Sequence, residues 1–488
     1  MSARVIVLGE DVNALVAAHY LARADHGVTL LRELAGPVED RLEAGWIPPK
    51  IVKDLDLARY GLEIHEPDPW AIVMPEDGGL ELSRDVRRSS EAIRRLSAHD
   101  AQKWPEFCER MHALARLLQS LYTAPPPEPM ANSLRGFAAS TRAALRVRAL
   151  GRRGMEDLFR LAPMPVADLL DDWFENDILK GLLGAAGVMH LAQGPRASGT
   201  AFNLLHHHVG SPCGVFRQPM SNIRSALGRR TEVTTRSGVV ARIDVRDVRA
   251  RSVVLDNGEK LQADAIVSAL PPVRTMIELV DPVWLDPQLV RALRNVRSRG
   301  VSVRMLLTLD RDPRFTTLVV APSLDYLERA FDAVKYGGVS PAPYIEARQT
   351  GQLGPGRYGV QVHVQYVPHA PQGGAWDTSE SDKLGRGVIA RLAEVLPGFA
   401  DWVIEKHVLT PQDLEQIHGY PQGQEYHAEI ALDQVLWMRP VPALAHYRTP
   451  VEGLYLCGPA MHPGGGIAGA AGANAAAVVL RELKKRKR

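Results

Sequence analysis

Residues 453–476 read GLYLCGPAMHPGGGIAGAAGANAA. The apolar run Leu454–Leu456 is typical of a short buried strand, and Gly458 follows soon after it. Three consecutive glycines, Gly464–Gly466, predict a tight turn, and the alanine-rich residues 468–483 predict a helix after it. The segment therefore predicts a strand, a glycine-rich turn and a helix, in that order.

The first 33 residues repeat this order. Apolar residues 4–8 lead into Gly9, residues 13–24 carry apolar side chains at helical spacing, and residues 28–31 form a second apolar run. This order opens a doubly wound dinucleotide-binding fold, in which ligands bind at the carboxyl ends of the strands. Both ends of the chain are therefore expected in one sheet, with their two turns at the same edge.

The chain between these ends changes character twice. Residues 89–177 have a mostly helical pattern, interrupted by Pro125–Pro127. From residue 234 the pattern becomes strand-like, with a hairpin turn at 256–258 and further strands near 303–309 and 358–366. The expected fold class is α/β: a Rossmann-like FAD/NAD(P)-binding domain interleaved with an α+β substrate domain.

The glycine fingerprint of such a domain is damaged here. In G-x-G-x-x-G, the first glycine makes the turn, the second lets the pyrophosphate approach, and the third allows close helix packing. The three positions hold Gly9, Asp11 and Ala14, and Glu10 adds a further acid. Because a helix N-terminus favours acids, the pair is expected to cap the helix and to fill the anion site with protein carboxylate.

The acid that should bind a ribose hydroxyl after the second strand is also replaced. Its position holds Arg32, and Glu33 follows one residue late. An arginine there accommodates a 2′-phosphate, so an NADP-dependent reductase without flavin is one hypothesis. The other interpretation of Arg32 is a solvated residue at a strand end.

Several long stretches, in the right order, resemble one family: the phytoene desaturase and carotenoid ketolase-like FAD-dependent oxidoreductases of the flavin amine oxidase superfamily. They are residues 453–476, 194–208, 263–272, 408–423 and 432–450. The resemblance covers nearly the whole chain. It implies FAD and a lipophilic polyene or isoprenoid-like substrate. It also implies a dinucleotide-binding domain in three segments (1–85, 216–280, 446–488), a helical cap (86–215) and a substrate domain (281–445).

The resemblance also implies which residues meet the flavin. The backbone of Val240 matches the position that contacts the adenine, and the glycines after Cys457 match those that approach the flavin and its phosphates. The cofactor-binding residues expected are Gly9, Asn13, Val240, Gly458, Gly464, Gly465, Gly466, Gly469 and Asn474. The alternative role of the glycines is close helix packing. No catalytic side chain is identified.

Departures from the family lie at the ADP end of the cofactor. The double glycine expected after the second strand is missing from LAGPVEDRLEAGW, which starts at Leu34, and a Gly-Gly-Met-Gly element reads Gln218–Ser221. The element nearest the isoalloxazine is kept. Two main hypotheses follow: a flavin oxidoreductase, or a pseudoenzyme with weakened or lost FAD that binds a lipophilic ligand or an active partner protein.

Composition limits the remaining classes. Lys and Arg number 58 against 56 Asp and Glu, a net charge of +2, which argues against a nucleic-acid binder. Three distant cysteines, the lack of a signal peptide and the lack of an apolar span indicate a cytoplasmic protein. The basic end Lys484–Arg488 is either a solvated terminus or a peripheral membrane contact. Neighbouring histidines His206–His208 point in different directions, so no metal is expected, and His427 and His462 are expected to be packed.

Overall fold

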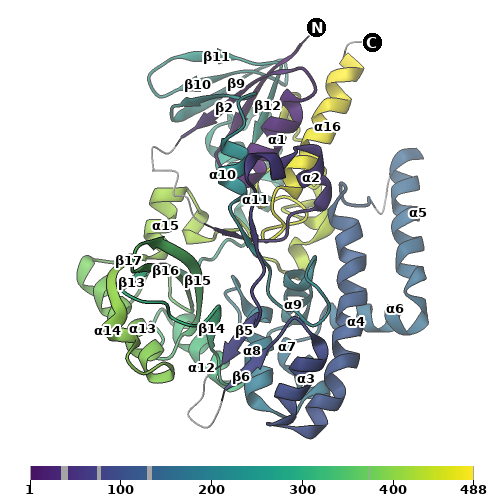
Figure 1. Ribbon diagram of the computed structural model, residues 1–488. Helices are drawn as coiled ribbons and strands as arrows, with labels where there is room; N and C mark the ends of the chain where they lie inside the picture. Colours follow the sequence, from purple (N-terminus) through teal and green to yellow (C-terminus); the bar gives the residue numbers. More distant parts are fainter. Residues whose placement is uncertain (1, 34–41, 74–78, 129–133, 373, 487–488) are drawn as a thin grey trace.

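The first and last elements of the chain share one sheet in the computed structural model, which describes residues 2–33, 42–73, 79–128, 134–372 and 374–486 (Figure 1). The sheet is parallel throughout, in the order β18-β12-β1-β2-β8. Its strands are β1 (Arg4–Leu8), β2 (Gly27–Arg32), β8 (Thr234–Ser237), β12 (Ala265–Ser268) and β18 (Leu454–Leu456). The Rossmann-like core expected from both chain ends is confirmed.

Helices α1 (Val12–Ala22) and α16 (Ala470–Arg486) pack on this sheet and on each other. Their crossing is close, because a Cβ atom on Gly472 would lie 2.1 Å from the Asn13 carbonyl oxygen. An antiparallel sheet of β9 (Val240–Arg246), β10 (Arg249–Leu255) and β11 (Lys260–Gln262) extends the domain, and the hairpin expected at 256–258 joins β10 to β11. A small sheet β3-β7-β4 lies nearby, with strands Glu43–Ala44, Met220–Ser221 and Ile64–His65.

A second, seven-stranded sheet has the order β17-β13-β16-β15-β14-β5-β6. Its strands are β5 (Ala71–Val73), β6 (Leu80–Leu82), β13 (Ser302–Leu309), β14 (Thr317–Val320), β15 (Tyr344–Gly354), β16 (Arg357–Gln365) and β17 (Val403–Leu409). Assigning all of residues 1–85 to the dinucleotide-binding domain is therefore wrong, because β5 and β6 join the other sheet through the pairing of Ile72 with Leu318. A three-residue apolar run predicts a strand but not its partner.

The helices fall into two groups. A mostly helical layer between residues 86 and 208, as expected, packs below the first domain (Figure 1). It contains α3 (Val86–Arg94), α4 (Ala98–Tyr122), α5 (Leu134–Ala149), α6 (Gly151–Leu161), α7 (Val166–Trp173), α8 (Asp177–Val188) and α9 (Thr200–His208). The others are α2 (Pro49–Asp54), α10 (Ile223–Gly228), α11 (Pro287–Arg294), α12 (Leu324–Lys335), α13 (Thr378–Val395), α14 (Phe399–Trp402) and α15 (Pro411–His418). Within the described ranges, no helix combines the length and apolar composition needed to cross a bilayer.

Candidate functional site

The turns after β1, β12 and β18 meet at the carboxyl edge of the parallel sheet. Gly9 has a φ of +105°, and its N–H donates to the Leu31 carbonyl at 3.0 Å. The N–H of Cys457 donates to Ser268 at 2.7 Å. A Cβ atom on Gly458 would lie 2.3 Å from the Ala269 carbonyl oxygen. Gly458 is therefore needed for the close approach of two strand ends, whatever else it binds.

The three-glycine turn lies against side chains of this chain. A Cβ atom on Gly465 would fall 1.9 Å from the Tyr426 ring, and one on Gly466 would fall 2.7 Å from Gln218 Oε1. His206 Nε2 lies 2.8 Å from the Gly465 carbonyl oxygen. Close packing therefore accounts for these glycines, the alternative role that the sequence left open, and Gln218 occupies space beside Gly466 where the family motif has glycine.

Gly464, Gly469 and the two expected asparagines also hold the domain together. A Cβ atom on Gly464 would meet Ile430, and one on Gly469 would meet Val16. Asn13 Nδ2 donates to Asp11 at 3.1 Å, and its Oδ1 accepts from the Gly472 N–H at 3.3 Å. Asn474 Nδ2 donates to the Tyr122 carbonyl at 3.1 Å. The polar groups of Asn13 and Asn474 already join elements distant in the sequence, and the role of these residues in binding a cofactor stays a prediction.

A cavity of about 160 Å³ opens under the glycine turn. Its opposite wall comes from the helical layer and the middle strands of the seven-stranded sheet, and includes His190, His363, Arg304 and Glu425. Arg304 donates to Glu425 at 2.6 Å, and the rings of His190 and Tyr426 lie 4.5 Å apart. One wall of the cavity therefore carries polar groups, although most of its lining surface is apolar. No sequence motif predicts this wall, because its residues come from distant strands and loops.

Burial decides the protonation of these groups. It lowers the pKa of His190 to about 3 and also lowers that of His363, so both imidazoles are neutral near pH 7. Burial raises the pKa of the Tyr426 hydroxyl, which therefore stays protonated. The groups that face the glycine turn can donate or accept hydrogen bonds, but the histidines do not carry charge at neutral pH.

A buried charge cluster supports the same wall. Glu346 accepts from Arg217 at 2.7 Å, from Arg348 at 2.6 Å and from Tyr344 at 2.6 Å. Burial alone would raise the pKa of Glu346, but the two guanidinium groups hold it well below its ordinary value. The cluster keeps an ionised carboxylate and two arginines in fixed positions between β15 and the segment after α9.

The chain's own acids occupy the opposite, ADP end of the expected cofactor site. Asp11 is the N-cap of α1 and accepts from the Ala14 N–H at 2.8 Å, so the capping role expected for it is confirmed. Burial raises the pKa of Asp11 to about 6, which leaves it mostly ionised at neutral pH. Glu10 pairs with Arg32 at 2.7 Å. Arg32 is thus already paired, so the NADP hypothesis that rests on it gains nothing from the structure.

Glu33 takes the backbone group expected to meet the adenine. Its Oε1 accepts from the Val240 N–H at 3.0 Å, and its other oxygen lies 3.0 Å from Arg274. The side chain is only 4% exposed. The cavity beside these residues measures about 60 Å³. The double glycine expected after the second strand falls largely at residues 34–41, outside the described part of the chain.

These observations test whether the residues fit FAD. Around Gly464–Gly466 the backbone borders a cavity, as a flavin ring would need. At the ADP end, carboxylates occupy the N-terminus of α1 and the Val240 N–H, and the cavity beside them, about 60 Å³, is smaller than the roughly 300 Å³ or more of typical ligand sites. A larger cavity of about 490 Å³ adjoins the glycine-turn cavity at Met220 and Arg348, away from the ADP end. In this arrangement the described residues do not fit FAD bound along its full length.

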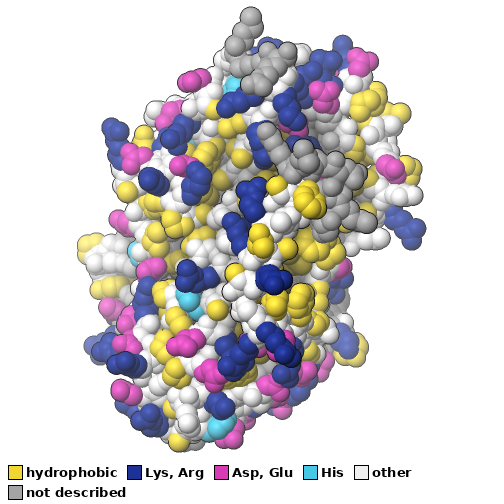
Figure 2. Space-filling model, turned by 90° about the vertical axis from the view of Figure 1, so that its right-hand side faces the viewer, with side chains coloured by type: hydrophobic (Ala, Val, Ile, Leu, Met, Phe, Trp, Pro, Cys, Tyr) yellow, Lys and Arg dark blue, Asp and Glu magenta, His cyan; other side chains and the backbone are white. Residues whose placement is uncertain are grey.

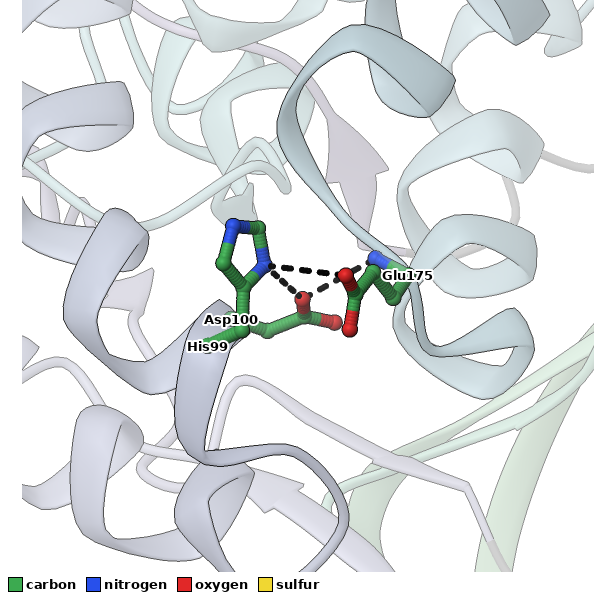
Figure 3. A group of neighbouring side chains, drawn as sticks. All are labelled: His99, Asp100 and Glu175. Carbon is green, nitrogen blue, oxygen red and sulfur yellow. Dashed lines mark hydrogen bonds and ion pairs between the residues drawn. The ribbon is translucent and has the colours of Figure 1, made fainter.

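Another polar group lies apart from this edge of the sheet, on α4 (Figure 3). His99 Nδ1 is 3.1 Å from Asp100 and 3.9 Å from Glu175. Both Asp100 oxygens accept backbone N–H groups, from Glu175 at 2.9 Å and Asn176 at 2.8 Å. Asp100 therefore joins α4 to the start of α8, and the group is explained by that structural role.

Comparison with known proteins finds a matching family and relatives that cover most of the chain. A family model described as flavin containing amine oxidoreductase matches residues 57–480. Pyridine nucleotide-disulfide oxidoreductase domain-containing protein 2 of Rattus norvegicus is 30% identical, over 98% of this chain and 93% of that protein. Hydroxyneurosporene desaturase of Rubrivivax gelatinosus is 26% identical, over 84% and 74%. An oxidoreductase from Methanosarcina mazei is similar in structure, with a TM-score of 0.60, 14% identity, and coverage of 98% of this chain and 100% of that one.

Proposed function

The chain belongs to the flavin containing amine oxidoreductase family, and from this premise we propose that it is an oxidoreductase whose reaction chamber is the cavity under Gly464–Gly466. The position of that cavity carries the proposal. It lies between a glycine turn at the carboxyl edge of a parallel sheet, where α/β folds bind ligands, and the polar wall of the second sheet.

The polar wall favours a substrate that carries a polar group. Neutral His190 and His363 and the protonated Tyr426 would orient it by hydrogen bonds, and the Arg304–Glu425 pair adds fixed charges. His363 already lies 3.2 Å from Gln365 Oε1, and Arg304 is paired with Glu425. An apolar substrate would displace water from His190 and Tyr426 without replacing its hydrogen bonds, which costs roughly 1–3 kcal/mol for each group. A polar amine, alcohol or acid is therefore the first substrate class to test.

A polyene or isoprenoid-like substrate is the second candidate. Similarity to a protein named hydroxyneurosporene desaturase supports it. To separate the two classes, the protein, with FAD supplied in excess, is assayed for reduction of an electron-accepting dye. A primary alkylamine and a secondary alcohol represent the first class, and neurosporene in detergent the second. Dye reduction with neurosporene alone would reject the polar substrate class.

FAD is the cofactor that the family implies, and we propose that this chain binds it weakly. The acids at the ADP end support this, since an incoming pyrophosphate would meet Asp11 and Glu10. The first measurement is the visible absorbance spectrum of the purified protein before and after FAD addition and desalting, with a fluorescence titration of FAD. Saturable binding that desalting removes is expected.

Either of two results would contradict this proposal. A stoichiometric flavin spectrum that survives desalting would show that the ADP end rearranges to bind FAD tightly. No saturable binding in the titration would reject the oxidoreductase proposal. The pseudoenzyme hypothesis would then apply; its one supporting observation is the set of carboxylates at the ADP end, and the comparisons lend it no support.

The remaining partner hypotheses concern the end of the chain. Lys484, Lys485 and Arg486 form the last turn of α16, and Arg486 pairs with Glu452 at 2.8 Å. That ion pair leaves Lys484 and Lys485 as the cations of this last helical turn that could meet an anionic membrane surface. A partner protein remains a further proposal, and the isolated chain's mass by light scattering, with and without a cell extract, is its first test.

A further inference from the structure

Helices α5 and α6 form a hairpin at the outer edge of the molecule, next to α4 (Figure 1). The inner side of α5 is apolar: Ala143 and Val147, with Leu150 directly after the helix, are partly buried against the core that includes α4. Their spacing is helical, so one face of α5 is satisfied by this packing.

The outer faces of the hairpin expose large apolar side chains. Phe137 is 68% exposed, Leu145 is 59% exposed, and Phe159 on α6 is 70% exposed. Phe137 and Leu145 are eight residues apart, so they lie on the same side of α5. Both exposed phenylalanines in the described part of the chain lie on this hairpin. Exposed apolar side chains occur elsewhere on the protein as well, but here three lie on two adjacent helices, which makes the hairpin a candidate interaction surface.

Charge distinguishes α5 from its neighbour. On α6, Arg152, Arg153 and Arg160 each pair with an acid, at 2.6–2.8 Å. Helix α5 contains no Asp or Glu. Three arginines of α5, Arg142, Arg146 and Arg148, are exposed and have no acidic partner among the described residues. Arg142 and Arg146 donate only to backbone carbonyls.

Figure 2 looks on to the side of the molecule where α5 lies in Figure 1. Hydrophobic side chains on this face are interleaved with basic and with acidic ones. A second copy of the chain would bring the same unpaired arginines to the contact, which disfavours self-association through α5. A surface that is both apolar and negatively charged complements it, and anionic lipid headgroups over acyl chains have this composition.

We propose that the α5–α6 hairpin docks the protein on an anionic membrane surface, with Phe137, Leu145 and Phe159 entering the headgroup boundary and the arginines of α5 contacting lipid phosphates. The proposal does not depend on FAD binding or on the substrate. It places the membrane contact at the hairpin, in contrast to the basic end of α16. An acidic partner protein is the alternative that the experiment must exclude.

The test is co-sedimentation of the full-length protein with vesicles. Phosphatidylcholine vesicles containing phosphatidylserine are compared with phosphatidylcholine alone, at low and high salt. Binding is expected to the anionic vesicles only and to weaken with salt. The double variant Phe137→Ser/Leu145→Ser and, separately, Arg142→Glu/Arg148→Glu should each lower the affinity by about tenfold or more.

Matched controls come from other exposed sites. Val283→Ser removes a 75% exposed apolar side chain far along the sequence, and Lys383→Glu/Arg386→Glu reverses two exposed charges on α13. Both should bind like the wild type. Circular dichroism checks that each variant is folded, and Phe159→Ser alone serves if the double variant is not.

Three outcomes would overturn the proposal. Equal binding by the hairpin variants and the wild type, with loss only in Lys484→Gln/Lys485→Gln, would assign the contact to the end of α16. A dimer by light scattering that Phe137→Ser dissociates would assign the face to a second copy. No binding to either vesicle would leave an acidic partner protein as the occupant of this face.

Discussion

A single carboxylate sets the character of the sheet edge where a nucleotide was expected. At the second glycine position of the fingerprint, Asp11 lets the helix cap itself, because its side chain accepts from the Ala14 N–H. The sequence could predict this contact, since an N-cap acid and its partner are only three residues apart. An internal anion here competes with a phosphate for the same N–H groups and the same helix dipole.

Asp11→Asn and Asp11→Gly separate the charge from the cap. Both remove the negative charge, so both should raise FAD affinity, by about tenfold if one ionic contact worth roughly 1.4 kcal/mol is relieved. Asparagine is as good an N-cap as aspartate and has no charge to bury, so Asp11→Asn should be more stable than the wild type at neutral pH, and glycine should lose only a few tenths of a kcal/mol of capping. Fluorescence titration of FAD and urea unfolding measure the two effects. Unchanged affinity in both variants would mean that no phosphate approaches α1.

Glu33 is the second residue to test, through a contact that spans 207 positions. Glu33→Ala frees the Val240 N–H, so we expect higher FAD affinity than in the wild type. Glu33→Gln keeps an oxygen acceptor and should raise affinity less. Both leave Arg274 without its carboxylate, so stability is measured in parallel. Equal affinities in the wild type and Glu33→Ala would show that the adenine does not use Val240.

At the scale of elements, the strands and helices at both ends of the chain were predictable, and the contacts between elements distant in the sequence were not. Short apolar runs followed by glycine predict β1 and β18, because a parallel strand buried on both faces has that local pattern. The same kind of run at β5 does not reveal that Ile72 pairs with Leu318. Two further contacts join residues far apart in the sequence: Tyr426 packs against Gly465, and Glu33 accepts from the Val240 N–H. The periodicity of apolar residues predicts neither.

The crossing of α1 and α16 gives a prediction at this scale. Gly472→Ala would place a methyl group 2.1 Å from the Asn13 carbonyl, and backbone cannot yield as a flexible side chain can. A loss of about 1–3 kcal/mol in unfolding free energy is expected, as for overpacked cores.

Gly387 on α13 is the matched control. Apart from its chain neighbours and the backbone of its own helix, no atom lies within 4 Å of a Cβ placed there, so Gly387→Ala should stabilise the helix by about 0.5–1 kcal/mol. Chemical denaturation of both variants measures the difference. An unchanged unfolding free energy for Gly472→Ala would mean that α1 and α16 move apart easily.

For the whole molecule, the number of buried histidines governs acid stability. Burial lowers the pKa of six histidines to about 3 or 4: His19, His190, His206, His208, His427 and His462. In the unfolded chain each titrates near its ordinary value of about 6.5. Below that pH the unfolded chain therefore binds more protons than the folded chain. The stability that comes from these neutral histidines is therefore fully present above about pH 6.5, and it decreases as the pH falls below that value.

Asp11 acts in the opposite direction, because its folded pKa of about 6 lies above its unfolded value. Between about pH 4 and 6 the folded chain gains its proton first, which adds stability on acidification. One carboxyl cannot balance six imidazoles, since each group contributes at most about 1.4 kcal/mol per pH unit. We therefore expect the urea midpoint to fall steeply between about pH 6.5 and 5, and Asp11→Asn to steepen that fall. A midpoint that stays constant down to pH 5 would show that these histidines are accessible to protons in the folded protein.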